Sequence, residues 1–308
     1  AGGLLLLARD TLEAVSFRTG ARRWSRALES GALAATALAR GPILLALAGA
    51  VTAVDPGTGR TLWRFAPAGA RRLQVAAFGS VAVAATDGAL LYGLDAAGSV
   101  AWRLRLPGAP LFAPVAAGTA CVVASATAPG ATLVAIDPAA GRRLWEAPLQ
   151  FAPSAPPLAA HGRVAVAGTV AGDPIVQVLD ARGRPVWTAA PPLHGALALA
   201  PGPRGALVGR DAKGALLALD RAGAARWQTP APSGSPPPGH LAPRVVRSAV
   251  LAAHEDLAVH DAATGALLGA APGLAPVRLL VDPELRVAAT DAEGVVTVLR
   301  LATHLSVV

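Results

Sequence analysis

The chain has 308 residues, of which 53% are hydrophobic and 15% are charged, a composition that excludes a disordered chain and supplies ample apolar surface for a core. Its formal net charge of +8 would suit an anionic partner, but the arginines occur as scattered pairs: Arg22 and Arg23, Arg71 and Arg72, Arg142 and Arg143, Arg182 and Arg184. This spacing, without interleaved aromatic residues, favours a solvated rim over a nucleic-acid groove.

The chain opens with the apolar run LLLLARD, residues 4–10, which we expect to be the second strand of a first repeated unit. An inner strand for that unit is then missing from this sequence. Either a few upstream residues supply that strand, or the first unit has only three strands. Both alternatives predict a processed protein or a domain taken from a longer chain.

Residues 32–51, ALAATALARGPILLALAGAV, are the one stretch that resembles a membrane helix, since a bilayer needs about 20 apolar residues. Arg40, Gly41 and Pro42 interrupt this stretch in the middle. Turn residues between two short apolar runs are typical of a hairpin. We therefore predict two buried strands here rather than a membrane span.

Residues 53–63, AVDPGTGRTLW, belong to a pattern A-x-D-x-x-T-G-x-x-x-W that recurs eight times. Its first position falls at Ala14, Ala53, Gly93, Ala135, Val178, Ala218, Val259 and Val298. Its last position accounts for all six tryptophans, Trp24, Trp63, Trp102, Trp145, Trp187 and Trp227, and is Gly269 and Val308 in the last two repeats. Its acidic position holds Asp55, Asp95, Asp137, Asp180, Asp220 and Asp261, with Ser16 and Arg300 in the remaining two repeats. A fixed period of about 40 residues indicates a propeller, a solenoid or a repeat array.

Four short apolar runs fill each period, as in LQVAAFGS, VAVAATDG, ALLYGLDA and VAWRLRL between residues 73 and 106. Runs of this length bounded by Gly, Asp or Pro predict strands and exclude the long helices of helical repeats. Four-stranded units arranged radially are the blades of a β-propeller, and each blade buries both faces against its neighbours. The sequence therefore predicts an all-β fold, an eight-bladed β-propeller of four-stranded antiparallel blades, as a single domain over residues 1–308.

The repeated pattern has a structural explanation. An Asp followed by Thr-Gly favours a tight turn, because the carboxylate accepts a hydrogen bond from the backbone two residues on and Gly allows positive φ. We expect this turn between the third and fourth strands of each blade. A tryptophan on the fourth strand is a large apolar plate with one N–H donor, suited to packing between adjacent blades.

The string AVDPGTGRTLW resembles the tryptophan-docking motif of the PQQ-like propeller family, which includes the quinoprotein alcohol dehydrogenases and the outer-membrane assembly lipoprotein BamB. The resemblance covers essentially the whole chain and implies eight blades, matching the count of repeats. The Gly-His and Trp-Asp pattern of WD-repeat propellers is not found.

Membership of that family leaves the function open, because the same fold carries redox enzymes and binding scaffolds. The resemblance implies, for the dehydrogenases, a Ca²⁺ ion held by Glu, Asn and Asp, two adjacent cysteines and a catalytic Asp. This chain has no Asn and a single cysteine, Cys121 in the apolar run ACVVASA, which we expect to be a buried inert thiol. We therefore predict no catalytic residue, no metal and no cofactor.

Two other polar motifs have structural explanations. HEDLAVH, which contains His254, Glu255, Asp256 and His260, straddles a predicted turn and strand without a zinc spacing. His161, His194 and His240 each lie beside Gly or Pro in predicted loops. We interpret all of them as surface residues.

A partner is expected where the loops vary. With strands A to D numbered outward, the D-to-A and B-to-C connections share one face, and the uniform Thr-Gly turns share the other. The varied segments are 147–157, 189–195 and 229–243, together with the B-to-C loops 125–130, 168–173 and 209–214. Varied loops on a rigid scaffold usually carry recognition, so the candidate contact residues are Asp173, His194, Pro236, Pro237, Pro238 and His240.

The sequence thus favours a non-catalytic scaffold for protein–protein interaction in a bacterial envelope or another extracytoplasmic assembly, such as the periplasm, without nucleic acid or a direct membrane span. The alternative is a ligand-sensing domain of a larger membrane-anchored receptor or kinase, with the ligand in a central channel. A PQQ-dependent dehydrogenase is the third hypothesis.

Overall fold

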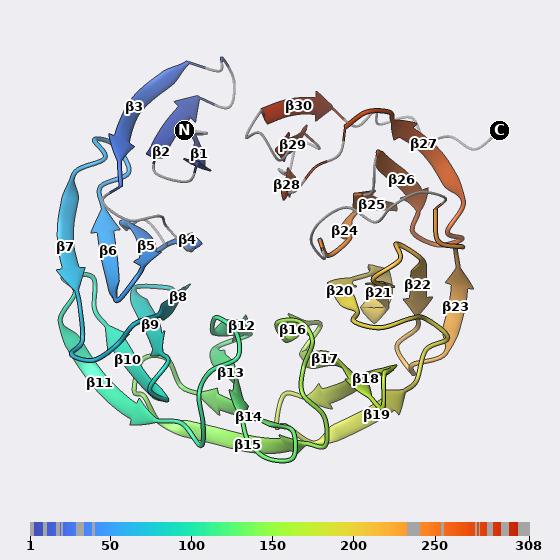
Figure 1. Ribbon diagram of the computed structural model, residues 1–308, viewed down its shortest axis with the longest axis horizontal. Coiled ribbons are helices and arrows are strands. Elements are labelled where there is room, and N and C mark those ends of the chain that lie inside the picture. Colours follow the sequence, from blue (N-terminus) through green and yellow to red (C-terminus); the bar gives the residue numbers. More distant parts are fainter. Residues whose placement is uncertain are drawn as a thin grey trace. The chain divides into compact units, whose positions relative to one another are not determined.

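The computed structural model describes residues 3–8, 11–16, 19, 21–28, 34–38, 41–232, 241–253, 256–274, 276, 278–281, 286–290 and 296–300. These ranges contain 30 strands and one short 3-10 turn, η1 (Pro203–Gly205). The strands form eight antiparallel sheets, numbered here in chain order, of which six have four strands and two have three described strands (Figure 1). The chain divides into two compact units, residues 1–152 with 181–183, and residues 153–180 with 184–308.

The first unit holds sheets 1 to 4. Sheet 1 consists of β1 (Gly3–Ala8), β2 (Thr11–Ser16) and β3 (Arg22–Ala27), and sheet 2 of β4 (Ala34–Ala37), β5 (Ile43–Leu47), β6 (Ala50–Val54) and β7 (Thr61–Phe65). Sheet 3 consists of β8 (Leu73–Phe78), β9 (Val81–Thr86), β10 (Leu90–Leu94) and β11 (Val100–Arg105), and sheet 4 of β12 (Val115–Ala117), β13 (Ala120–Ala126), β14 (Ala131–Ile136) and β15 (Arg143–Leu149).

The second unit holds all the strands of sheets 5 to 8. Sheet 5 consists of β16 (Leu158–Ala160), β17 (Arg163–Val170), β18 (Asp173–Asp180) and β19 (Pro185–Ala189), and sheet 6 of β20 (Ala198–Pro201), β21 (Leu207–Arg210), β22 (Leu216–Leu219) and β23 (Ala225–Gln228). Sheet 7 consists of β24 (Arg244–Val246), β25 (Ala249–Ala253), β26 (Leu257–Asp261) and β27 (Leu267–Ala271), and sheet 8 of β28 (Arg278–Val281), β29 (Arg286–Thr290) and β30 (Val296–Arg300).

The core lies between successive sheets of each unit. In sheet 2 the second and third strands, β5 and β6, are buried along their whole length, because each face is covered by apolar side chains. Leu44 of β5, for example, belongs to one cluster with Leu73 and Val75 of β8. The fourth strands alternate between exposed and half-buried residues, with the tryptophan half-buried. Burial on both faces explains why the inner runs are apolar without clear alternation.

Two expected boundaries differ from the structure. Within residues 32–51, β5 and the start of β6 are buried as expected, but β4 is mostly exposed, because it is the edge strand of sheet 2 and pairs with β5 alone. The predicted loop 168–173 is a two-residue turn, since β17 and β18 extend to Val170 and Asp173. Ala171 and Gly172 both have positive φ, 52° and 93°, and turns of this kind match the twist of the paired strands.

The described ranges include no helix with the length and apolar character that crossing a membrane requires.

Candidate interaction face

Each tryptophan lies directly opposite the first residue of its own repeat, across the third and fourth strands. The cross-strand pairs are Ala14 with Trp24, Ala53 with Trp63, Gly93 with Trp102, Ala135 with Trp145, Val178 with Trp187, and Ala218 with Trp227. In the seventh repeat Val259 is paired with Gly269 in the same register. The register shifts immediately after each of these pairs, so the same irregularity recurs in every repeat where both strands are described.

Each indole N–H points to the turn of the following repeat. Nε1 donates to the backbone oxygen of the residue that follows the acidic position: Trp24 to Pro56 at 3.0 Å, Trp63 to Ala96 at 2.8 Å, Trp102 to Pro138 at 2.9 Å, Trp145 to Ala181 at 2.9 Å, Trp187 to Arg221 at 2.9 Å and Trp227 to Ala262 at 3.1 Å. The six contacts are therefore chemically identical. The motif links one repeat to the next.

The glycine of the same turn lies against the indole ring. A Cβ placed on Gly59 would lie 2.7 Å from Cε3 of Trp24, and the ring of the preceding repeat's tryptophan is equally close to Gly98, Gly141, Gly183, Gly223 and Gly265. Gly59 also has a φ of 73°, a conformation that residues with a Cβ adopt at a cost. Glycine is thus required twice at this position, for its backbone conformation and for the space the indole occupies.

The acidic residue organises the turn itself. Oδ1 of Asp55 accepts hydrogen bonds from the backbone N–H of Gly57 and Thr58 and from the Thr58 hydroxyl. These bonds, the Thr58 hydroxyl first, hold the pKa of Asp55 below its ordinary value. The same effect lowers the pKa of Asp261 through Thr264, and that of Asp220 through the backbone N–H of Ala224. The expected Asp–Thr-Gly turn is present.

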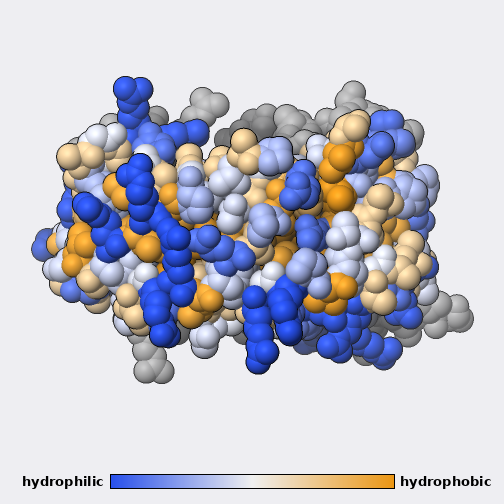
Figure 2. All heavy atoms as spheres, turned by 90° about the horizontal axis from the view of Figure 1, so that it is seen from below, coloured by the Kyte–Doolittle hydropathy of each residue, from blue (hydrophilic) through white to orange (hydrophobic). Residues whose placement is uncertain are grey.

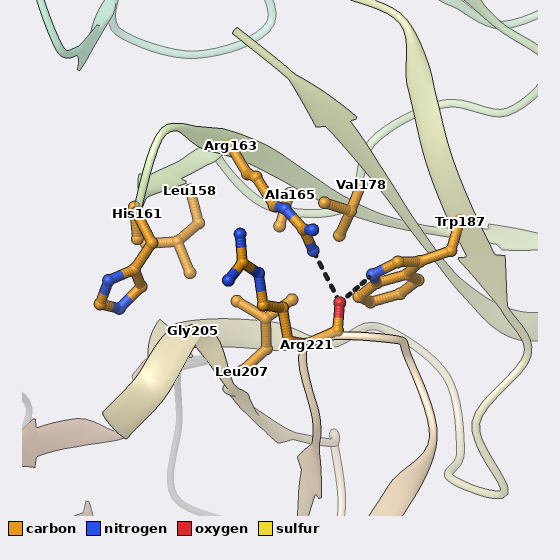
Figure 3. Close-up of a pocket in the computed structure, with 10 residues that line it drawn as sticks. Leu158, His161, Arg163, Ala165, Val178, Trp187, Gly205, Leu207 and Arg221 are labelled. Carbon is orange, nitrogen blue, oxygen red and sulfur yellow. Dashed lines mark hydrogen bonds between the residues drawn. The ribbon is translucent and has the colours of Figure 1, made fainter.

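The face that carries these turns is closely packed where sheets 5 and 6 meet. The backbone oxygen of Arg221 accepts hydrogen bonds from Nε1 of Trp187 and from Nη1 of Arg163, at 2.9 and 2.6 Å (Figure 3). The hollow beside them has a volume of about 20 Å³, which is the size of a water molecule rather than of a ligand. His161 lies at its edge, with Nε2 3.2 Å from the backbone oxygen of Gly202.

On the opposite face the D-to-A connections contact the B-to-C loops, as the topology requires. Gly108 N donates to Oγ of Ser125, and Ala126 N donates to the oxygen of Ala109 at 2.8 Å. Asp87 accepts from the backbone N–H of Arg71. We call this set of loops the B–C face. Its loops are held to one another by hydrogen bonds and form a defined surface in each unit.

Of the six residues predicted to contact a partner, the structure describes two, which lie in separate segments. Asp173 is exposed and begins β18, directly after the two-residue turn. His194 is exposed, and its backbone N–H donates to Oδ2 of Asp211 at 3.2 Å, which anchors the connection 189–195 to the loop 209–214. Pro236, Pro237, Pro238 and His240 lie outside the described residues. The structure does not bring Asp173 and His194 into contact with each other.

Two charged residues that the sequence placed in a surface loop are buried. Arg210 ends β21 with 3% of its surface exposed, and Asp211 follows with 2%. The carboxylate of Asp211 accepts from the backbone N–H groups of Lys213 and Ala215 as well as from His194. The signal available in the sequence was that these two charged residues follow the apolar run ALV with only Gly209 between them.

The arginine pairs predicted to be solvated are exposed at all eight positions. Arg22 pairs with Glu13 at 3.1 Å, Arg143 with Glu146 at 2.7 Å and Arg184 with Asp180 at 2.7 Å. Figure 2 shows hydrophilic side chains interspersed with apolar ones on the face drawn there. This pattern agrees with a solvated rim.

The residues that a quinoprotein site uses to hold its Ca²⁺ ion and cofactor do not match those of this chain. Cys121 is buried without a disulfide partner, and burial raises the pKa of its thiol. Among the described residues no three His, Cys, Asp or Glu side chains are grouped as metal ligands would be. His254 and Glu255 lie outside the described residues, and the chain has no Asn to complete the Ca²⁺ ligands implied for the dehydrogenases.

The comparisons with known proteins identify the family. A family model described as "Outer membrane protein assembly factor BamB" matches residues 47–173 and 114–304. The chain belongs to the PQQ-like, BamB-like β-propeller family. The predicted family and fold class are confirmed.

Solved structures show the same fold at low sequence identity. BamB from Moraxella catarrhalis is 19% identical with a TM-score of 0.73, covering 99% of this chain and 94% of that one. The computationally designed Ika8 protein is 16% identical with a TM-score of 0.80, covering 98% and 94%. A chain of the Mitotic Checkpoint Complex is 14% identical with a TM-score of 0.61, covering 84% and 83%. No curated protein sequence matches the chain.

Proposed function

We propose that this BamB-like propeller is a non-catalytic scaffold that binds a partner protein through its B–C face within an extracytoplasmic, envelope-associated assembly. The observation that carries the proposal is that the repeated residues and the varied loops lie on different faces. The repeated residues are used in contacts between successive repeats, while the loops of varied length and sequence lie on the B–C face. The family description, which names outer membrane protein assembly, supports the envelope context.

Within this proposal Trp24, Trp63, Trp102, Trp145, Trp187 and Trp227 dock successive blades, and Asp55, Asp95, Asp137, Asp180, Asp220 and Asp261 shape the receiving turns. Asp173 and His194 are proposed partner contacts. Both are exposed, and varied loops on a rigid scaffold commonly carry recognition. Residues 229–243, with Pro236, Pro237, Pro238 and His240, are proposed as part of the same surface.

The test is partner capture from a bacterial envelope extract, quantified by mass spectrometry, with the purified chain and two surface variants. His194→Glu changes the B–C face, and Ala222→Glu is the matched control because Ala222 is exposed in the turn that follows Asp220, on the opposite face of the same unit. We expect the same protein to be captured by the wild type and by Ala222→Glu and to be depleted several-fold with His194→Glu. Equal depletion by the control variant would overturn the choice of face.

A second candidate function, the ligand-sensing domain of a membrane-anchored receptor or kinase, is favoured by a hollow between sheets 6 and 7 described below. The gene sequence upstream of Ala1 distinguishes the two. A signal or lipoprotein sequence favours the scaffold, and a kinase with a membrane span favours the sensor.

A further inference from the structure

A hollow of about 500 Å³ lies between sheets 6 and 7, wholly within the second unit. It is lined on one side by residues of β21 and β22 and of the segment that follows β23, and on the other by residues of β25, β26 and β27. Its volume falls within the range of about 300–1,000 Å³ typical of small-molecule sites. The hollow between sheets 5 and 6 is far smaller, at about 20 Å³.

Small side chains leave this space open. Sheet 7 contributes Ala252, Ala253, Ala258 and Ala270 to the lining, whereas Leu44 and Leu73 meet where sheets 2 and 3 pack together. Proline and leucine side chains complete the apolar part of the wall, at Pro230, Pro232, Leu216 and Leu267. Most of the wall is therefore suited to an apolar body.

Arg210 is the cation in this lining, and it is almost completely buried, with 3% of its surface exposed. Its guanidinium has five N–H donors, yet among the described residues its acceptor is the backbone oxygen of Leu241, 3.4 Å from Nη1. Within the same residues it forms no ion pair. The carboxylate of Asp211 is a neighbouring negative charge, but it does not accept a hydrogen bond from the guanidinium within the described residues. Buried N–H donors without acceptors are costly, so this arginine has donor capacity that a ligand would satisfy.

The other polar groups of the lining already have partners. Oγ1 of Thr229 accepts from Leu216 N, and Oδ1 of Asp256 accepts from Gly273 N at 2.7 Å. Nδ1 of His260 lies 3.1 Å from the oxygen of Gly265. The neighbouring carboxylate of Asp211 accepts from three backbone N–H groups. These contacts leave Arg210 as the group best placed to recognise an anion, and a carboxylate matches the fork of a guanidinium.

We propose that the hollow between sheets 6 and 7 binds a small molecule that carries one carboxylate on an apolar body, with the carboxylate paired to Arg210 and the body against the alanine and proline lining. The proposal does not depend on the partner-binding function, because it rests on this cavity alone.

The test uses octanoate as the probe and octanamide, its neutral counterpart, as the comparison, both titrated into the full chain by calorimetry. We expect octanoate to bind with one-to-one stoichiometry and octanamide to bind at least tenfold more weakly. Arg210→Gln should remove the difference between the two compounds. Equal affinity of the wild type for octanoate and octanamide, or no heat of binding for octanoate at millimolar concentration, would overturn the proposal.

A second variant keeps the test decisive if Arg210→Gln does not fold. Ala258→Leu retains the arginine and fills the hollow, so it should weaken octanoate at least tenfold. Ala101→Leu, on the exposed side of β11, is the control and should bind octanoate like the wild type. Unchanged octanoate binding by Ala258→Leu would exclude this cavity as the site.

Discussion

Nε1 of Trp187 donates a hydrogen bond to the backbone oxygen of Arg221, 2.9 Å away and 34 residues later in the chain. Arg221 directly follows Asp220, so the tryptophan of one repeat contacts the acidic turn of the next (Figure 3). Six tryptophans make this contact. The tryptophan at the end of one motif therefore binds the acidic turn of the next motif, and the repeated pattern specifies how successive repeats join.

Replacing Trp102 by alanine should destabilise the protein by about 3 kcal/mol, the lower end of the cost of large-to-small changes, because the indole is half-buried. Trp102→Phe retains most of the apolar contact but loses the bond to Pro138, and should cost about 1 kcal/mol from that bond plus some packing. Urea denaturation measures both. Arg103→Ala, at the exposed neighbouring position, is the control and should change stability by less than about 0.5 kcal/mol.

Gly59→Ala and Gly118→Ala separate backbone strain from the indole contact. Both glycines have positive φ, 73° and 63°, but a Cβ on Gly59 would meet Trp24 whereas a Cβ on Gly118 would meet nothing within 4 Å. We expect Gly118→Ala to lower the free energy of unfolding by about 1 kcal/mol, from the cost of the positive φ alone. Gly59→Ala should lower it by a further 1 to 3 kcal/mol or so, because its Cβ overpacks the indole. Equal losses in thermal or urea unfolding would show that the indole imposes no constraint there.

Much of the fold was predictable because its signals are local and repeated. The Asp and Thr-Gly residues, as in Asp55 to Gly59, encode a turn within five residues, and the apolar runs encode buried strands. The recurring tryptophan predicts contact between blades. Its acceptor, a backbone oxygen such as that of Pro56, has no side-chain signature, so the sequence does not identify it.

The candidate sites were less predictable, because their features depend on neighbours distant in the chain. Arg210 and Asp211 read as surface loop residues, and their burial arises from packing against segments around Leu241 and His194. The hollow beside Arg210 likewise depends on alanines contributed by another sheet, such as Ala258. The turn at Ala171 and Gly172 lies inside the predicted loop 168–173, but the loop was predicted too long, because a non-glycine residue adopts positive φ there.

Acid should remove the contribution of Asp55 to stability. Its pKa is lowered in the folded state from an ordinary value of 3.8, so the carboxylate stabilises the fold above that value and loses this effect as the pH falls through the folded pKa. We expect the stability difference between the wild type and Asp55→Asn to be constant at neutral pH and to narrow below pH 3.8. Urea denaturation at each pH measures this difference in the free energy of unfolding. A difference that stays constant down to pH 2 would contradict the role assigned to the carboxylate.

Asp211→Ala should be among the most damaging single changes on the B–C face. It leaves three backbone N–H groups without their acceptor, at Lys213, Ala215 and His194. The bond from Ala215 is buried and the other two are partly buried, so the loss should be about 2 to 3 kcal/mol. Asp137→Ala is the matched control, because it removes a similar acceptor from two N–H groups in an exposed turn that water can then solvate. Hydrogen exchange should show faster exchange of the His194 amide in Asp211→Ala only.

The most direct test of the contact between repeats is a double-mutant cycle of Trp102→Ala and Gly141→Ala, measured as free energies of unfolding in urea. A Cβ on Gly141 would lie 2.5 Å from the Trp102 ring, so Gly141→Ala should be costly in the wild type. In the Trp102→Ala background only the cost of the positive φ should remain, giving a coupling energy of about 1 to 3 kcal/mol. Strictly additive losses would contradict the account.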